Sequence, residues 1–170
     1  MNIPRSAWRA VCPILVIVAL SEPLAAQEVD PVQNEVKLVS EARIAARVND
    51  DALADARLTA KGLFQETMAP SVLLARRAVM LCGWLQNDND YGRAMKVADR
   101  VVKRLANLKE TTPEDRAERL YWEALLRGRF LDRKREAIAL LQEAAKIAPE
   151  DERLSTLDLE FTSAVAEFGR

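Results

Sequence analysis

Apolar residues recur every three or four positions along most of this chain, in blocks separated by short polar turns. This spacing places the apolar side chains on one face of an α-helix, unlike the strict alternation of a half-buried strand. Turn-forming residues are scarce, with seven Pro and five Gly in 170 residues, whereas the helix formers Ala, Leu, Arg and Glu are abundant. The pattern therefore predicts an all-α protein.

Polar clusters mark the predicted helix starts and turns. In Thr112-Pro113 the Thr can cap a helix and the Pro can take its first position, with two acidic residues following in the first turn. Asp30-Pro31 has the same order, and residues 49–51 and 87–90 are polar turns. Pro70 is interpreted as ending the second helix. Together these signals predict seven helices, joined as antiparallel hairpins in one domain.

Each predicted helix carries an apolar stripe that we expect to face the core. The stripes, in chain order, are Val32, Val36 and Val39; Leu53, Ala56, Ala60, Leu63 and Thr67; Leu74, Ala78, Leu81 and Leu85; Tyr91, Ala94, Ala98, Val101, Leu105 and Leu108; Ala117, Tyr121, Ala124 and Leu125; Ala137, Leu141, Ala144 and Ala148; Leu154, Leu157, Phe161, Val165 and Phe168. A domain of this length can bury enough surface to fold without disulfides.

The first 26 residues have the composition of a secretory signal peptide. Two arginines precede an apolar run at residues 10–20, and small residues follow up to Ala26. This run is shorter than the roughly 20 residues that a membrane-spanning helix requires. We predict cleavage after Ala26 and export, with the periplasm as the favoured location and residues 27–170 as the mature domain. Secretion from the cell, or an uncleaved signal acting as an anchor, are the alternatives.

Several kinds of chemistry are disfavoured by composition. The chain has no histidine, the commonest general base and metal ligand, and no Gly-rich phosphate loop or paired-Cys metal site. Cys82 is the only cysteine after residue 26 and is interpreted as a small packing residue. With 25 basic and 26 acidic residues, the surface offers no general attraction for nucleic acid. We predict no catalytic, cofactor or metal site, although an enzyme subunit using carboxylates or Lys remains an alternative.

One further pattern concerns spacing between helices. Counting back from Pro149, Ala144, Leu141, Ala137 and Tyr121 lie 5, 8, 12 and 28 positions earlier. This spacing resembles that of the tetratricopeptide repeat, most clearly over residues 118–151 and, without the closing proline, over residues 75–108. The sequence departs from the repeat where aromatic residues are usual, with Leu141 and Gly128 in their places.

The resemblance implies a right-handed α-solenoid of about three antiparallel hairpins plus a capping helix. Another array of hairpins and a closed helical bundle are the alternatives. In this repeat family the first helices of the hairpins line a concave surface that binds other proteins or peptides.

Carried onto this sequence, the resemblance implies a specific set of surface residues. Tyr121 takes the core position, which leaves Trp122 facing the concave surface. Arg119, Leu126 and Arg129 share that surface, and the preceding unit adds Arg76 and Val79. Trp and Arg are enriched in binding hot spots.

We therefore predict a non-catalytic scaffold that binds a protein or peptide. A self-assembling structural protein of the cell envelope, with copies forming a homo-oligomer, is the alternative. Trp122 could instead pack against the last helix. The basic run at residues 127–135 could bind phosphate or an acidic surface, but is expected to pair with neighbouring acidic residues.

Overall fold

A computed structural model describes residues 30–61, 68–110 and 112–168, and this part of the chain contains helices and turns without any strand. Along the sequence lie α1 (Pro31–Arg47), α2 (Asp51–Thr59), α3 (Pro70–Asn87), α4 (Tyr91–Leu105), α5 (Pro113–Leu125), the π-helical turn η2 (Leu126–Phe130), α6 (Lys134–Ile147) and α7 (Glu152–Phe168). The all-α prediction is confirmed. None of these helices is long and apolar enough to cross a bilayer. Residues 1–26, where the signal peptide is predicted, lie outside the described ranges.

The predicted N-terminal caps at Asp30 and Thr112 are formed, and two residues of the polar turns, Asp50 and Asp90, also act as caps. The side chains of Asp30, Asp50, Asp90 and Thr112 accept hydrogen bonds from backbone N–H groups in the first turns of α1, α2, α4 and α5, respectively. Each cap satisfies one of the N–H donors that a helix start leaves without a partner. The turn residues therefore fix where four of the helices begin.

The turns at the ends of α1 and α3 have the same geometry. Asn49 and Asn89 adopt left-handed conformations, with φ of 61° and 60°. The next N–H, from Asp50 or Asp90, donates to the carbonyl oxygen of Ala45 at 3.0 Å or of Leu85 at 2.8 Å. This hydrogen-bonded ending reverses the chain and starts the following helix.

A third turn, after η2, follows the same plan with one difference. Asp132 is left-handed, with φ of 54°, but the N–H of the next residue, Arg133, bonds to the carbonyl one residue further back, that of Arg127, at 2.8 Å. The extra residue is accommodated by the wider π-helical turn.

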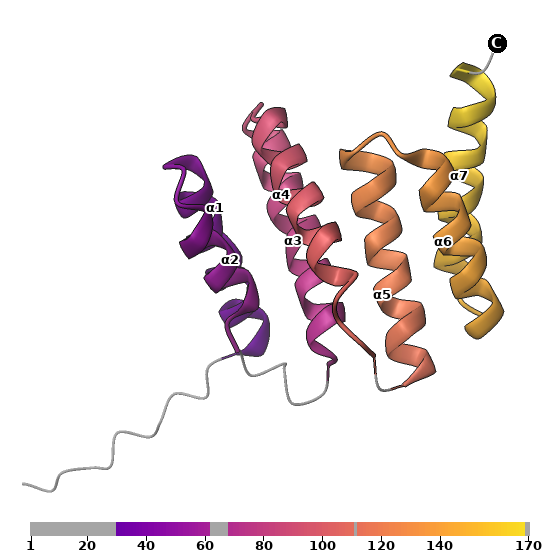
Figure 1. The fold of residues 1–170 in the computed structure, drawn as a ribbon, viewed down its shortest axis with the longest axis horizontal. Coiled ribbons are helices and arrows are strands. Elements are labelled where there is room, and N and C mark those ends of the chain that lie inside the picture. Colours follow the sequence, from indigo (N-terminus) through magenta and orange to yellow (C-terminus); the bar gives the residue numbers. More distant parts are fainter. Residues whose placement is uncertain (1–29, 62–67, 111, 169–170) are drawn as a thin grey trace, which may run out of the picture.

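Successive helices pack as pairs, and the pairs lie side by side in a row (Figure 1). The pairs are α1 with α2, α3 with α4, and α5 with α6, while α7 packs on α6. Neighbouring pairs are joined mainly through their first helices, since α1 contacts α3 and α3 contacts α5. In the described residues, α2 and α4 do not contact each other to a similar extent, and neither do α4 and α6.

The core divides into two clusters that meet at the boundary between α3 and α5. One cluster joins α1 to α4 and includes Leu126 and Phe130 of η2, and the other joins α5, α6 and α7. Val79 and Trp122 pack against both clusters. The predicted stripe of α3, and Ala137, Leu141 and Ala144 of α6, are buried as expected.

Several predictions about helices and faces are wrong. The second helix ends at Thr59, so its stripe does not extend through Ala60, and Pro70 begins α3 rather than ending the helix before it. Five residues expected to face the core are exposed, namely Val32, Val36, Leu53, Ala56 and Tyr91. Among the described residues, α1 packs mainly on α2 and α3, which leaves Val32 and Val36 uncovered.

Two residues of the third hairpin also differ from expectation. Leu120 is buried where Tyr121 was expected, and Tyr121 is half-buried beneath the guanidinium of Arg153. Phe168 belongs to α7, but its side chain lies outside the description.

Candidate partner-binding surface

Four of the six predicted binding residues lie half-buried on first helices: Arg76 and Val79 on α3, and Arg119 and Trp122 on α5. We call these four residues the first-helix face. Val79 and Trp122 come together at the α3–α5 boundary, where both pack on the two core clusters. The helices that carry them are also the ones that join neighbouring hairpins, so their relative positions are fixed by the core.

Trp122 is held in place by polar and aromatic contacts. Its indole Nε1 donates to Glu118 Oε1 at 2.8 Å, and its ring meets that of Tyr121 edge to face, with centroids 5.1 Å apart. The guanidinium of Arg153 on α7 lies 4.7 Å from the centroid of Tyr121 and also bonds to Glu118. The predicted alternative, packing against the last helix, is met in part, because Trp122 also packs against the core cluster that contains Leu154, Leu157 and Phe161 of α7. The remaining exposed part of the indole is available in a fixed orientation.

Arg119 belongs to a chain of ion pairs along α5. Its Nε donates to Glu110 Oε1 at 2.9 Å, and a second nitrogen pairs with Glu123. Glu123 is buried and also accepts two hydrogen bonds from Arg127, at 2.9 and 2.6 Å, and Arg127 in turn pairs with Glu136. Burial lowers the pKa of Arg127, but hydrogen bonds and charge from Glu123 and Glu136 outweigh it, so that its pKa is raised. Arg119 therefore supports the fold as well as the surface.

Arg76 is similarly engaged. Its guanidinium lies 3.3 Å from Glu35 on α1 and within 3.9 Å of the Met68 sulfur. The charges of the two arginines of the first-helix face are thus neutralised within the chain. What this face offers a partner is therefore mainly the apolar surface of Val79 and Trp122.

The other two predicted residues are placed differently. Leu126 has an exposed fraction of 0%, because it belongs to the core cluster under α3 and α4, so the prediction that it lines an accessible surface is wrong. Arg129 is half-exposed and pairs with Glu160 on α7 at 2.9 Å, away from the α3–α5 boundary.

Sequence reasoning missed the buried charges. The side chain of Arg77 is fully buried and donates to the carbonyl oxygens of Leu58 and Ala60 at 3.1 and 2.6 Å. Its position, three residues after Leu74 and four before Leu81, places it beside the buried stripe. This helical spacing was the one sequence feature that could have predicted the burial of Arg77.

Cys82 is fully buried between α3 and α4, with its sulfur 3.3 Å from the carbonyl oxygen of Ala94. Burial raises the pKa of its thiol to about 12. Among the described residues, no three His, Cys, Asp or Glu side chains are grouped so that they could hold a metal ion.

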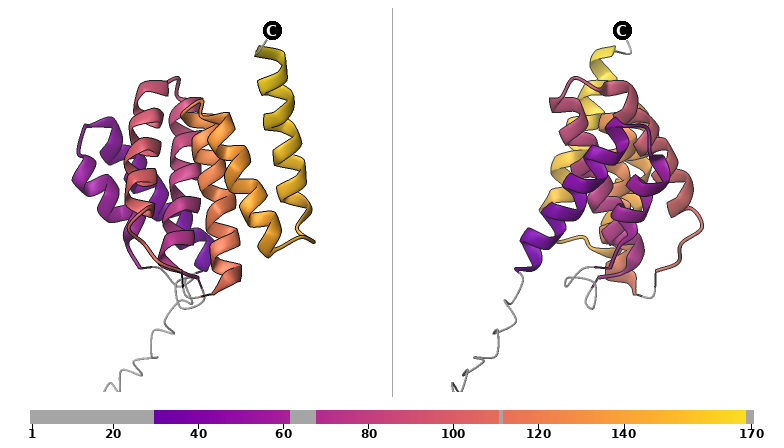
Figure 2. Two further views of the ribbon diagram at one scale, coloured as in Figure 1. Left: turned by 45° about the vertical axis from the view of Figure 1, so that its right-hand side comes forward. Right: turned by 90° about the vertical axis from the view of Figure 1, so that its left-hand side faces the viewer.

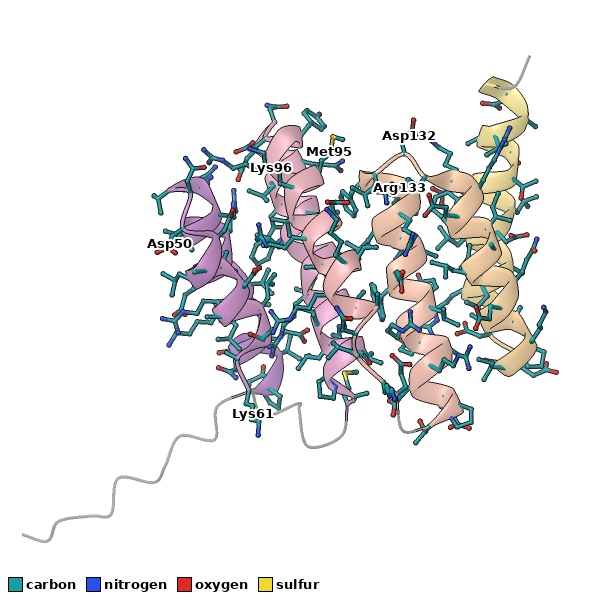
Figure 3. All side chains as sticks on the ribbon, in the orientation of Figure 1. Asp50, Lys61, Met95, Lys96, Asp132 and Arg133 are labelled. Atoms are coloured by element: carbon teal, nitrogen blue, oxygen red, sulfur yellow. The ribbon has the colours of Figure 1, made fainter. Side chains whose placement is uncertain are left out.

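Two surface cavities are lined by residues other than Trp122. One, of about 610 Å³, is lined by the α4–α5 connection, the start of α5 and Ile147, and includes Glu110 and Arg119. Another, of about 540 Å³, lies between residues 132–136 and Ala164 and Val165 of α7. Figure 3 shows Asp132 and Arg133 at the turn that forms part of its rim.

No protein-family model, no curated protein and no solved structure matches this chain.

Proposed function

We propose that this protein is an exported, non-catalytic scaffold whose first-helix face binds another protein or a peptide. The observation that carries the proposal is the asymmetry of packing between hairpins. Neighbouring first helices contact each other, whereas neighbouring second helices do not contact each other to a similar extent. A row built in this way curves, with its first helices on the inner side, which is the side that repeat proteins use for binding.

The repeated turn supports the comparison with tetratricopeptide-like arrays. The hairpins α1–α2, α3–α4 and α5–α6 all reverse through a left-handed residue followed by the start of the second helix. Three such hairpins followed by α7 support the proposal of a right-handed solenoid with a final capping helix. The outward side of α7 carries exposed Ser, Thr and Glu, as expected of a terminal helix, with Leu159 as the one large apolar side chain exposed among its described residues.

The chemistry of the first-helix face favours a partner that brings an apolar side chain. Val79 and Trp122 are half-exposed between arginines that already have acidic partners. Because these side chains are held by the core and by ion pairs, little ordering entropy is lost on binding. The predicted signal at residues 1–26 supports a partner in the exported compartment.

Site-specific photo-crosslinking tests the proposal. A benzoylphenylalanine replaces Met80 or Gly83, which lie half-exposed near Val79 on α3, and the matched control carries it at exposed Thr156 on α7. We expect the α3 positions to crosslink the same protein in the exported fraction and the α7 position not to do so. Equal products from all three positions, or none from α3, would contradict the proposal. N-terminal sequencing of the exported form should begin at Gln27.

A second candidate, self-assembly, is favoured by one observation. The free side of α1 exposes Val32, Val36, Ile44 and Val48, with exposed fractions of 55%, 41%, 62% and 70%. Apolar side chains at an open end of a row can be covered by another copy. Sedimentation equilibrium should then show association that Ile44→Lys abolishes, and a monomer at every concentration would exclude it.

A further inference from the structure

The helix α4 has a clear excess of basic residues, although the chain as a whole is nearly neutral. The chain has a formal net charge of −1, yet α4 carries one acidic residue, Asp99, and five basic residues, namely Arg93, Lys96, Arg100, Lys103 and Arg104. The α4 surface therefore produces a local positive field although the chain as a whole has none.

The basic residues of α4 fall into two groups. Arg100 is engaged by Asp51 and Asp55 of α2, at 3.2 and 2.9 Å, and Arg93 bonds to the Arg47 carbonyl oxygen. Lys96 and Arg104 are exposed, and no acidic side chain of the described residues pairs with either. These two side chains, about 12 Å apart along the helix axis, are free to meet an external anion.

Two exposed apolar side chains accompany these cations. Tyr91 and Met95 have exposed fractions of 56% and 51% and are one helical turn apart at the start of α4. Met95 and Lys96 both lie on the upper part of α4 in Figure 3. Tyr, together with Lys and Arg, is characteristic of the region where a protein meets lipid headgroups.

The position of α4 favours a broad partner over a peptide. The helix lies at the outer side of the row when viewed along the row (Figure 2, right), on the side away from the contacts between first helices. Neither of the two cavities described above is lined by an α4 residue. Flexible cations on an outer helix can each find a separate phosphate, whereas a bound peptide needs a groove to fix its backbone, and neither of these two cavities supplies one at α4.

We propose that the exposed face of α4, defined by Tyr91, Met95, Lys96, Lys103 and Arg104, docks the protein on an anionic lipid surface. Lys96 and Arg104 contact headgroup phosphates directly. Lys103 can do so by leaving its pair with Asp99 on the same helix, and Tyr91 and Met95 enter the boundary between headgroups and acyl chains. This peripheral contact is independent of the first-helix face, so an occupied first-helix face would still point away from the lipid.

Co-sedimentation with vesicles tests the proposal on the full chain. Binding is compared between vesicles of phosphatidylcholine alone and vesicles that also contain phosphatidylglycerol, so that the difference isolates the anionic contribution. The test variant is Lys96→Glu with Arg104→Glu. The control variant is Lys37→Glu with Lys146→Glu, which changes two exposed lysines on α1 and α6 and the net charge equally. Circular dichroism verifies that both variants remain helical.

We expect anionic lipid to strengthen binding of the unmodified chain, and added salt to reverse this gain. The α4 variant should bind anionic vesicles about tenfold or more weakly, while the control variant stays within about twofold. Tyr91→Ser with Met95→Ser should weaken binding without altering its dependence on salt.

Three outcomes would overturn the proposal. The first is that anionic lipid does not strengthen binding, and the second is that the two charge variants lose binding equally. The third is that labelled polyglutamate binds the α4 face while vesicles do not. The last outcome would assign the face to an acidic polypeptide. Photo-crosslinking from Met80 and Gly83 tests the first-helix face separately. Failure of lipid binding can therefore be told apart from failure of partner binding.

Discussion

The ring of Phe161 on α7 covers the backbone of Gly128 in η2, leaving no space for a side chain at that position. A Cβ added to Gly128 would lie 2.7 Å from Cε1 of the ring and closer still to Cζ and Cε2. Gly128 thus allows the ring of Phe161 on the last helix to pack directly against the backbone of the third hairpin.

Gly128→Ala should therefore destabilise the protein. Replacing a helical Gly by Ala normally stabilises by up to about 1 kcal/mol, but Phe161 is buried and overpacking costs about 1–3 kcal/mol. Gly83→Ala is the matched control, because an added Cβ there has no atom within 4 Å, and it should raise stability. Urea unfolding measures both. A Gly128→Ala protein at least as stable as the unmodified chain would show that α7 moves away freely.

Glu123→Ala should be among the most damaging changes on α5. It removes the shared carboxylate of Arg119 and Arg127, and breaking a buried ion pair from one side costs about 3–5 kcal/mol. Glu136→Ala removes an exposed partner of Arg127 and should cost less than about 1 kcal/mol. Chemical denaturation of the two variants compares the costs, and similar values would contradict a structural role for Glu123.

The adjacent arginines of α3 should behave differently. Arg77→Ala leaves a cavity and deprives the Leu58 carbonyl of a buried donor, at a cost of about 3 kcal/mol or more. Arg76→Ala would remove the ion-pair partner of buried Glu35, so the milder comparison is Arg76→Lys, which keeps a positive charge beside that carboxylate and should cost about 1 kcal/mol. Thermal unfolding should rank Arg77→Ala well below Arg76→Lys, and the reverse order would contradict the buried placement of Arg77.

The Cys82 thiol should resist modification in the folded protein. Because burial raises its pKa to about 12, almost no thiolate exists at neutral pH, and the sulfur is inaccessible. In a Cys12→Ser background, labelling by Ellman's reagent should be slow in buffer and rapid in denaturant. Fast labelling without denaturant would show that α3 and α4 separate readily.

Acid should weaken the contact between α1 and the end of α3. A hydrogen bond from Arg43, with the charges of Arg43 and Arg47, lowers the pKa of Asp88. Because the folded pKa lies below the unfolded one, this contribution is present above about pH 4 and is lost as the pH falls through the folded value. Asp88→Asn should lower stability at neutral pH and reduce its loss in acid. An unchanged acid profile in urea unfolding would contradict this role.

The starts of several helices could be predicted because local chemistry decides them. Asp30 and Thr112 cap their helices in the order expected from the sequence, and Pro follows each at the first helical position. Pro70 shows the limit of the same rule. A proline is tolerated at the first position of a helix and also excludes the residues before it from helix, so the sequence allowed either boundary.

The candidate surface was predictable in part. Trp122 and Val79 were selected by analogy with a repeat family, and both lie half-buried where α3 meets α5. Leu126 was selected by the same phase but is buried, because the π-helical turn changes the direction of residues that follow Leu125. No local sequence pattern predicted that π-helical turn.

The sequence by itself determined that this chain is helical, where four of the capped helices begin, and which stripe of α3 is buried, because capping and apolar periodicity act within a few residues. Tertiary structure decided which face of α1 is left open, that Arg77 and Glu123 are buried, and that Gly128 must lack a side chain. Those outcomes depend on atoms brought close by packing between helices distant in the sequence, and no local preference encodes which neighbour a side chain will meet.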